Sequence, residues 1–124
     1  MDEIATLWWR QAIEDLVSAK ANIAPGRYYI SALMAQQAVE KALKAPIIAK
    51  SGELVKSHDL VHLAAKVCLP QGLVDLCDGL SKVYLTARYP DAYGDIPSES
   101  FTHDDAVSDI KAAEEVIAWV KKRM

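Results

Sequence analysis

The sequence has no long apolar run and no basic leader, and both absences exclude membrane insertion. No uninterrupted apolar stretch is longer than that of residues 45–49, whereas a helix needs about 20 apolar residues to cross a bilayer. The chain begins with the acidic residues Asp2 and Glu3, where a secretory signal would be basic. We therefore expect a cytoplasmic protein that does not contact a membrane.

Cysteines and positive charge are also scarce. The two cysteines, Cys68 and Cys77, are too few for a disulfide framework or a four-cysteine zinc site, and we interpret both as reduced packing residues. The formal net charge of −3 leaves no broad cationic surface, so a nucleic acid would have to be bound by a local cluster of basic residues. Duplex DNA is therefore not an expected partner.

The residues that are present have the balance of a globular domain. Hydrophobic residues make up 52% and charged residues 25% of the 124 positions, far from the composition of disordered chains. A chain of this length can bury roughly two-thirds of its unfolded surface around one core. We expect residues 1–124 to form a single domain.

Apolar residues recur every three or four positions through most of the chain, which is the spacing of amphipathic helices. No segment alternates as a half-buried strand does. The fold class predicted is therefore all-α, an antiparallel up-and-down bundle of four long helices plus one short helix. The predicted helices cover residues 4–23, about 27–50, 58–67 (the short one), 73–89 and a segment that begins after Thr102.

Several residues refine these boundaries. Pro46 lacks an N–H group and clashes with the preceding turn, which predicts a kink or an early end of the second helix near residues 42–45. Residues 91–101 have the composition of an exposed loop. Thr102 and Asp105 have the spacing of a capping box for the last helix. The apolar stripe predicted for the first helix includes Ile4, Trp8, Ala12, Leu16, Ala19 and Ile23, widened by Trp9, Ile13 and Val17.

Polar residues interrupt the apolar pattern of the second predicted helix between Gln36 and Lys44. Gln37, Lys41 and Lys44 fall on one line at helical spacing, and Glu40 can pair with Lys44 across one turn. One interpretation is a solvated helix face that carries a Glu/Lys pair. The other is a polar seam that faces a phosphate group.

Two histidines, His58 and His62, lie one helical turn apart. Their spacing is similar to that of the His-Glu-x-x-His zinc motif, but Asp59 is shorter than the motif's glutamate, and the remaining histidine, His103, is far along the chain. We therefore expect no metal. His58 and Asp59 are interpreted instead as the cap of the short helix.

An arginine and several tyrosines gather where the fourth predicted helix ends. Tyr84 and Arg88 share one helix face, and Tyr89 and Tyr93 follow. A guanidinium group offers a planar fork for a phosphate, and aromatic rings can stack on a base. In the alternative interpretation, Arg88 satisfies the C-terminus of its helix and pairs with Asp91.

Together these segments resemble the HEPN family (higher eukaryotes and prokaryotes nucleotide-binding). The resemblance covers nearly the whole chain. It implies a helical bundle that dimerises so that two polar clefts meet, often encoded beside a minimal nucleotidyltransferase. The segments that carry it are, in order, the first helix with Trp8, Trp9, Asp15 and Leu16, the run QQAVEKALK of residues 36–44, His58-Asp59-Leu60 and Arg88-Tyr89-Pro90-Asp91.

The resemblance also implies where catalysis would take place. Catalytic members are similar to metal-independent ribonucleases in which an arginine is followed, four to six residues later, by a histidine. Arg88 matches the arginine, but the window after it holds Tyr93, Gly94 and Asp95. The missing histidine weighs against RNA cleavage and leaves phosphate binding by Arg88. By analogy with toxin-like members, Tyr93 is a candidate for modification by the nucleotidyltransferase.

The predicted function is that of a dimeric domain that binds nucleotide or single-stranded RNA and acts with a nucleotidyltransferase in a toxin–antitoxin-like or accessory role. No cofactor is expected. Two alternatives remain open, a metal-independent ribonuclease toxin with proton transfer by Tyr93 or His103, and a non-catalytic helical adaptor. The residues predicted to line a shared cleft are Gln37, Lys41, Lys44, Tyr84 and Arg88, with Arg88 and Tyr93 as candidate catalytic residues.

Overall fold

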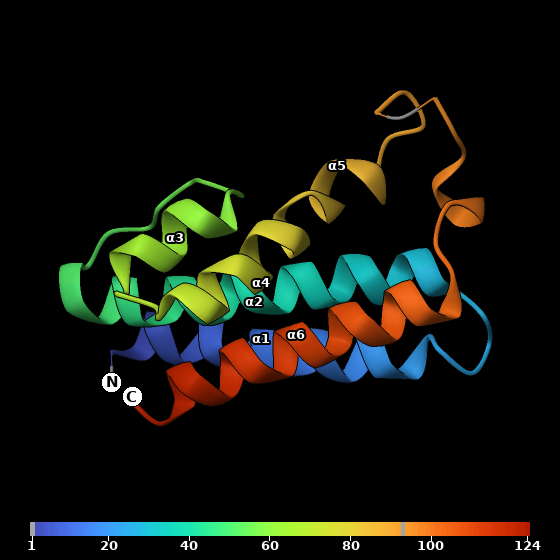
Figure 1. Ribbon diagram of the computed structural model, residues 1–124. Coiled ribbons are helices and arrows are strands. Elements are labelled where there is room, and N and C mark those ends of the chain that lie inside the picture. Colours follow the sequence, from blue (N-terminus) through green and yellow to red (C-terminus); the bar gives the residue numbers. More distant parts are fainter. Residues whose placement is uncertain (1, 93) are drawn as a thin grey trace.

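The computed structural model describes residues 2–92 and 94–124, and every regular element in these ranges is a helix (Figure 1). The predicted all-α bundle is confirmed. The helices are α1 (Glu3–Ala21), α2 (Tyr28–Ser51), α3 (Leu60–Lys66), α4 (Gln71–Ser81), α5 (Val83–Thr86) and α6 (His103–Lys121), with a 3-10 turn at Pro97–Glu99.

The long helices run up and down, and α2 lies at the centre of the bundle. In Figure 1, α1 and α4 run in one direction while α2 and α6 return in the other. α2 packs against α1 and α6 on one side and against α3, α4 and α5 on the other. The side chains of α2 are therefore enclosed over most of its circumference, and it carries the polar segment identified in the sequence.

α1 begins at Asp2, whose carboxylate accepts a hydrogen bond from the backbone N–H of Ala5. Its buried face is narrow and built largely from alanines, with Ala5, Ala12 and Ala19 fully buried at seven-residue spacing. Such small side chains let α1 approach α2 closely. Ile4 and Val17, which were predicted to belong to the buried stripe, are instead exposed.

α2 continues through Pro46 without ending, so the predicted early end near residues 42–45 is wrong. The helix stops only at Gly52, which adopts the left-handed conformation (φ 72°) and donates its N–H to the carbonyl of Ile48. A proline inside a helix costs about 3 kcal/mol, while each fully buried Leu or Ile contributes roughly 1.5–3 kcal/mol. Burial of Leu43, Ile47 and Ile48 around the proline thus outweighs its cost.

The fourth predicted helix is divided in two, so the bundle contains a second short α-helix that was not predicted. α4 ends at Ser81 and α5 begins at Val83. The hydroxyl of Thr86 donates to the carbonyl of Lys82 at 3.2 Å, competing with the backbone N–H of the same residue. This side-chain bond bends helices, and it lies where the break occurs.

The predicted helix caps are largely confirmed. Thr102 and Asp105 form the capping box of α6, with bonds of 3.1 and 2.9 Å. The carboxylate of Asp59 accepts from the backbone N–H groups at positions 61 and 62 at the start of α3. His58 takes no part in that cap. α3 is shorter than the predicted helix, because Asp59 is its N-cap and Val67 its C-cap.

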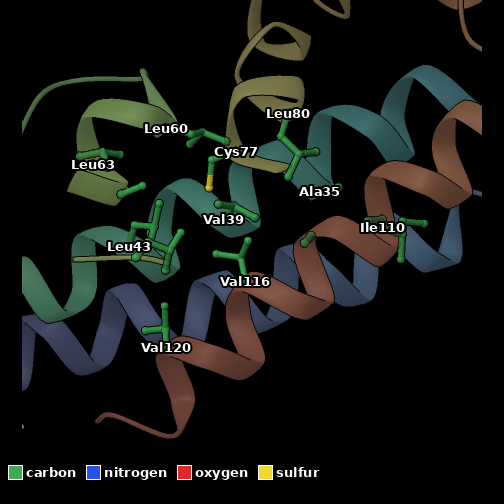
Figure 2. Packing of buried hydrophobic residues seen from close by; sticks show 14 of the residues in the cluster. Ala35, Val39, Leu43, Leu60, Leu63, Cys77, Leu80, Ile110, Val116 and Val120 are labelled. Carbon is green, nitrogen blue, oxygen red and sulfur yellow. The ribbon is translucent and has the colours of Figure 1, made fainter. Parts of the chain in front are cut away.

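One apolar cluster joins α2, α3, α4 and α6 and includes Ala19 of α1 (Figure 2). Cys77 lies inside it, as predicted, and burial raises the pKa of its thiol to about 12. Cys68 is exposed, so its prediction as a packing residue is wrong. No helix in the described part of the chain has both the length and the apolar character needed to span a bilayer. The labelled side chains of the cluster in Figure 2 include Val39, Leu43, Leu60, Leu63, Leu80, Val116 and Val120.

Candidate functional site

A row of polar side chains is buried along α2. Gln36, Glu40 and Lys44 follow one another at intervals of four residues and are 0%, 4% and 4% exposed. Gln36 Nε2 donates to Glu40 Oε1 at 3.3 Å, and Lys44 Nζ donates to Glu40 Oε2 at 3.1 Å. The predicted Glu40–Lys44 pair is confirmed, but it is not on a solvated face, because other helices cover this side of α2.

The second row on α2 turns toward α1. Lys41 Nζ donates to Asp15 Oδ2 of α1 at 2.5 Å and to Gln37 Oε1 at 3.3 Å. Gln37 Nε2 in turn donates to Gln36 Oε1 at 2.7 Å and links the two rows. Gln37 and Lys41 share one line as predicted, whereas Lys44 belongs to the row of Glu40. Both lysine ammonium groups are therefore matched by carboxylates within the protein.

His58 joins the buried row from the connection between α2 and α3. Its Nδ1 lies 2.9 Å from Glu40 Oε1, and its side chain is 50% exposed. An imidazole that donates from Nδ1 to a carboxylate presents Nε2 as an acceptor on its other edge. The sequence interpretation missed this role, because 18 residues separate His58 from Glu40 and no local spacing relates them.

Tyr84 of α5 connects His58 to Arg88. The imidazole of His58 and the ring of Tyr84 are stacked, with centroids 4.2 Å apart and planes 14° from parallel. The Arg88 guanidinium carbon lies 4.6 Å from the centroid of the Tyr84 ring and 5.5 Å from that of Tyr89. The side-chain contact predicted from the one-turn spacing of Tyr84 and Arg88 is present. We call His58, Tyr84 and Arg88 the aromatic–arginine stack.

Arg88 is exposed at the outer end of this stack. Within residues 2–92 and 94–124, its side chain forms no ion pair, and none with Asp91 in particular. Lys44 is connected to Arg88 through Glu40, His58 and Tyr84 in succession. Of the three cations predicted to line the cleft, Lys41 and Lys44 are paired with carboxylates, whereas Arg88 is exposed to solvent and forms no ion pair with a described residue.

The remaining predicted residues lie elsewhere. Tyr93 falls outside the described residues. His103, the other proposed proton-transfer group, is at the start of α6, where its Nδ1 is 3.3 Å from Asp104 and its ring packs edge-on against Tyr28. Within the described ranges, no three His, Cys, Asp or Glu side chains come close enough together to hold a metal ion.

Similarity to known proteins agrees with this helical architecture. The model of the HEPN domain family matches residues 5–123. The chain belongs to the HEPN family. A protein of Methanocaldococcus jannaschii named "Putative toxin MJ1304" is 30% identical over 131 residues, a match that covers 94% of this chain and 86% of that protein.

Three solved structures superpose on nearly the whole chain. The structure of TT1696 from Thermus thermophilus has a TM-score of 0.89 at 31% identity and covers 97% of this chain and 98% of its own. The archaeal HEPN homologue ST0689 has a TM-score of 0.82 at 31% identity, covering 99% and 98%. A HEPN domain protein from Thermotoga maritima, with a TM-score of 0.70 at 20% identity over 93% and 94% of the two chains, shares the fold.

Proposed function

We propose that this HEPN domain binds single-stranded RNA or nucleotides at the aromatic–arginine stack. The observation that carries the proposal is the exposed Arg88 guanidinium, held over the Tyr84 ring at 4.6 Å with no carboxylate paired to it among the described residues. A guanidinium in this state offers several N–H donors in one plane to a phosphate group. Tyr89, 42% exposed beside it, offers a ring on which a base can stack.

In this proposal the polar residues of α2 do not contact the ligand, and Glu40 positions the stack through its bond to His58. Lys41 and Lys44 are already paired with the carboxylates of Asp15 and Glu40, and Gln37 donates to the amide oxygen of Gln36. These residues therefore do not hold the phosphate themselves. Binding would then depend on few positive charges. This agrees with the net charge of −3 and with a single-stranded ligand.

We further propose that the domain acts as a homodimer in a toxin–antitoxin-like pair with a minimal nucleotidyltransferase, and that Tyr93 is the residue modified. Support comes from family membership and from the toxin name of the Methanocaldococcus relative. Incubation with the nucleotidyltransferase, ATP and Mg²⁺ should add mass to the wild type but not to Tyr93→Phe. Equal mass addition to both would contradict this assignment.

Binding is tested by fluorescence anisotropy with a labelled single-stranded RNA. Arg88→Ala should weaken binding at least tenfold, as expected for a lost charge-assisted bond. The slope of log K against log salt, which is negative, should become less steep by about 0.7, the effect of one lost phosphate contact. Arg10→Ala, at an exposed position of α1, is the matched control and should leave both values unchanged. Equal affinity of wild type and Arg88→Ala would contradict the site. A stable hetero-complex without RNA affinity would favour the adaptor.

A second candidate function is metal-independent RNA cleavage, which the position of His58 favours. The motif histidine is absent after Arg88, but His58 supplies an imidazole against the same Tyr84 ring that contacts Arg88. With Nδ1 turned to Glu40, Nε2 is available to take the proton of a ribose 2′-OH. The 2′-oxygen would attack the adjacent phosphorus, and the bond to the 5′-oxygen would break. That oxygen would take up a proton from the His58 imidazolium or from water, and Arg88 would stabilise the added charge on the phosphate oxygens.

The cleavage mechanism is tested in EDTA with a single-stranded DNA that contains one ribonucleotide. The expected product carries a 2′,3′-cyclic phosphate, and the all-deoxy strand should remain intact. His58→Ala and Arg88→Ala should abolish cleavage, while His62→Ala, one turn away on α3, should not. Absence of cleavage between about pH 6 and 9, where an imidazole can be tuned, would reject this function and leave RNA binding standing.

A further inference from the structure

A hollow of about 580 Å³ opens where the C-terminal ends of α2, α3 and α6 meet. In Figure 1 this is the end of the bundle that carries the labels N and C, opposite the end at which α5 lies. The hollow is therefore separate from the aromatic–arginine stack. Its volume falls in the range of about 300–1,000 Å³ that is usual for small-molecule sites.

The floor of the hollow is apolar. Ile47 and Val120, which line it, also belong to the main core cluster. Trp119 and Val67 are partly buried and pack against that cluster from the sides. An exposed concave surface of this kind favours an apolar ligand, because burial contributes roughly 25 cal/mol for each Å² removed from water.

The rim of the hollow is cationic in a chain that is acidic overall. Lys50, Lys66 and Arg123 line it together with one acidic side chain, that of Glu53, and with the last residue of the chain, Met124. None of the three cations forms an ion pair with a described residue. The guanidinium carbon of Arg123 lies 3.9 Å from the ring centroid of Trp119, so this cation is held against one of the apolar residues that line the hollow.

Helix capping does not account for the two lysines. Among the described residues, the ammonium groups of Lys50 and Lys66 donate no hydrogen bond to a helix carbonyl, unlike the Arg123 guanidinium, which donates to the carbonyl of Trp119 at 3.2 Å. Their charge remains available to a ligand.

We propose that this hollow binds a small organic anion with an apolar body, of the class of a medium-chain carboxylate or alkyl phosphate. The alkyl chain would lie against Ile47, Val120 and Trp119, and the anionic oxygens would face Lys50, Lys66 and Arg123. Neither the RNA-binding proposal nor the cleavage proposal depends on this site. A failure of this proposal leaves both of them unaffected, and their failure leaves this one unaffected.

The binding of such a ligand can be followed through the chemical labelling of a cysteine of this chain. Cys68 is exposed on the rim of the hollow, whereas Cys77 is buried in the core with a thiol pKa of about 12. A thiol reagent at pH 8 therefore reacts with Cys68 while the protein is folded. Decanoate or decyl phosphate should slow this labelling at least fivefold, and acetate or decanol, which lack the apolar body or the charge, should not.

Matched variants complete the test. The combined variant Lys50→Gln, Lys66→Gln and Arg123→Gln should lose protection by both anions, while Lys111→Gln, at an exposed position in the middle of α6, should keep it. The labelling rate of each variant without ligand and its circular dichroism show that the fold is intact. Equal protection by decanol, protection that persists in the combined variant, or no protection by either anion would each overturn the proposal.

Discussion

Oε1 of the buried Glu40 lies 2.9 Å from Nδ1 of the half-exposed His58, while its other oxygen accepts from Lys44 at 3.1 Å. The Glu40 carboxylate thus binds both the buried Lys44 ammonium and the imidazole of His58 at the surface. Burying such a pair seldom adds stability over apolar residues of the same volume, but removal of one partner leaves the other charge buried and unmatched.

Glu40→Ala should therefore lower the free energy of unfolding by about 3–5 kcal/mol, as expected for a broken buried ion pair. Urea unfolding followed by circular dichroism measures it, with Glu115→Ala on the exposed face of α6 as the control. Adding Lys44→Met to Glu40→Ala should restore part of the loss, since the unmatched charge is then gone. A loss below about 1 kcal/mol in the single variant, the size of a surface pair, would contradict this account of the pair.

Pro46→Ala should stabilise the protein, because it restores the backbone donor that α2 lacks at this position. The expected increase in the free energy of unfolding starts from the proline penalty of about 3 kcal/mol in a helix. It is reduced because alanine gives the unfolded chain more conformational entropy, and because the surrounding helices have packed around the proline ring. We expect about 1–2 kcal/mol in urea unfolding. Pro70→Ala, at the N-cap of α4, should give no such gain. Destabilisation by Pro46→Ala would mean that the ring itself is needed for packing.

Asp109 on α6 makes stability depend on pH. Burial, together with the nearby Asp105, raises the pKa of the Asp109 carboxyl from 3.8 to about 6. The folded protein then holds a proton that the unfolded chain releases, so this residue's contribution to stability falls as pH rises from about 4 to about 6. At pH 7, Asp109→Asn should be more stable than the wild type, by at most about 3 kcal/mol.

The measurement is a series of urea unfolding curves between pH 4 and 7. The stability difference between Asp109→Asn and the wild type should grow across this interval, because the amide does not titrate. Asp104→Asn, whose side chain is fully exposed, is the matched control and should follow the wild type. A difference that is constant with pH would rule out the raised pKa as its cause.

Thr102→Ala should cost about 1 kcal/mol, the usual effect of removing an N-cap side chain. The hydroxyl of Thr102 accepts from the backbone N–H of Asp105, and no other side chain is bonded to that N–H among the described contacts. Thermal unfolding should show the loss, and Ser108→Ala on the exposed face of the same helix should not. Equal melting temperatures for wild type and Thr102→Ala would show that the cap adds nothing.

Features set by neighbouring residues could be predicted from the sequence, and features set by distant ones could not. The cap of α6 depends on Thr102 and Asp105 alone, so its spacing was sufficient. Whether α2 continues past Pro46 depends on the helices that bury Leu43 and Ile48, so the early end that local propensity allowed was wrong.

The candidate site shows the same division. Tyr84 and Arg88 are one turn apart, and their contact followed from that spacing. Lys41, placed by its helical line beside Lys44, instead reaches Asp15 on another helix, 26 residues away in sequence. His58 was interpreted as a cap because the carboxylate that binds it comes from the middle of α2.

The break between α4 and α5 leaves Tyr84 of the aromatic–arginine stack on a weaker support than Glu40, the carboxylate that binds His58. Glu40 is fixed by the long central helix, whereas Tyr84 lies in a helix of four residues, Val83–Thr86, and such short elements open at low free energy. Hydrogen exchange should accordingly be fast at the amides of residues 83–88 and slow at those around Glu40. A ligand that binds to the aromatic–arginine stack would slow exchange at residues 83–88 and leave the exchange around Glu40 unchanged. Binding would then be detected as an ordering of the short helix and the residues that follow it.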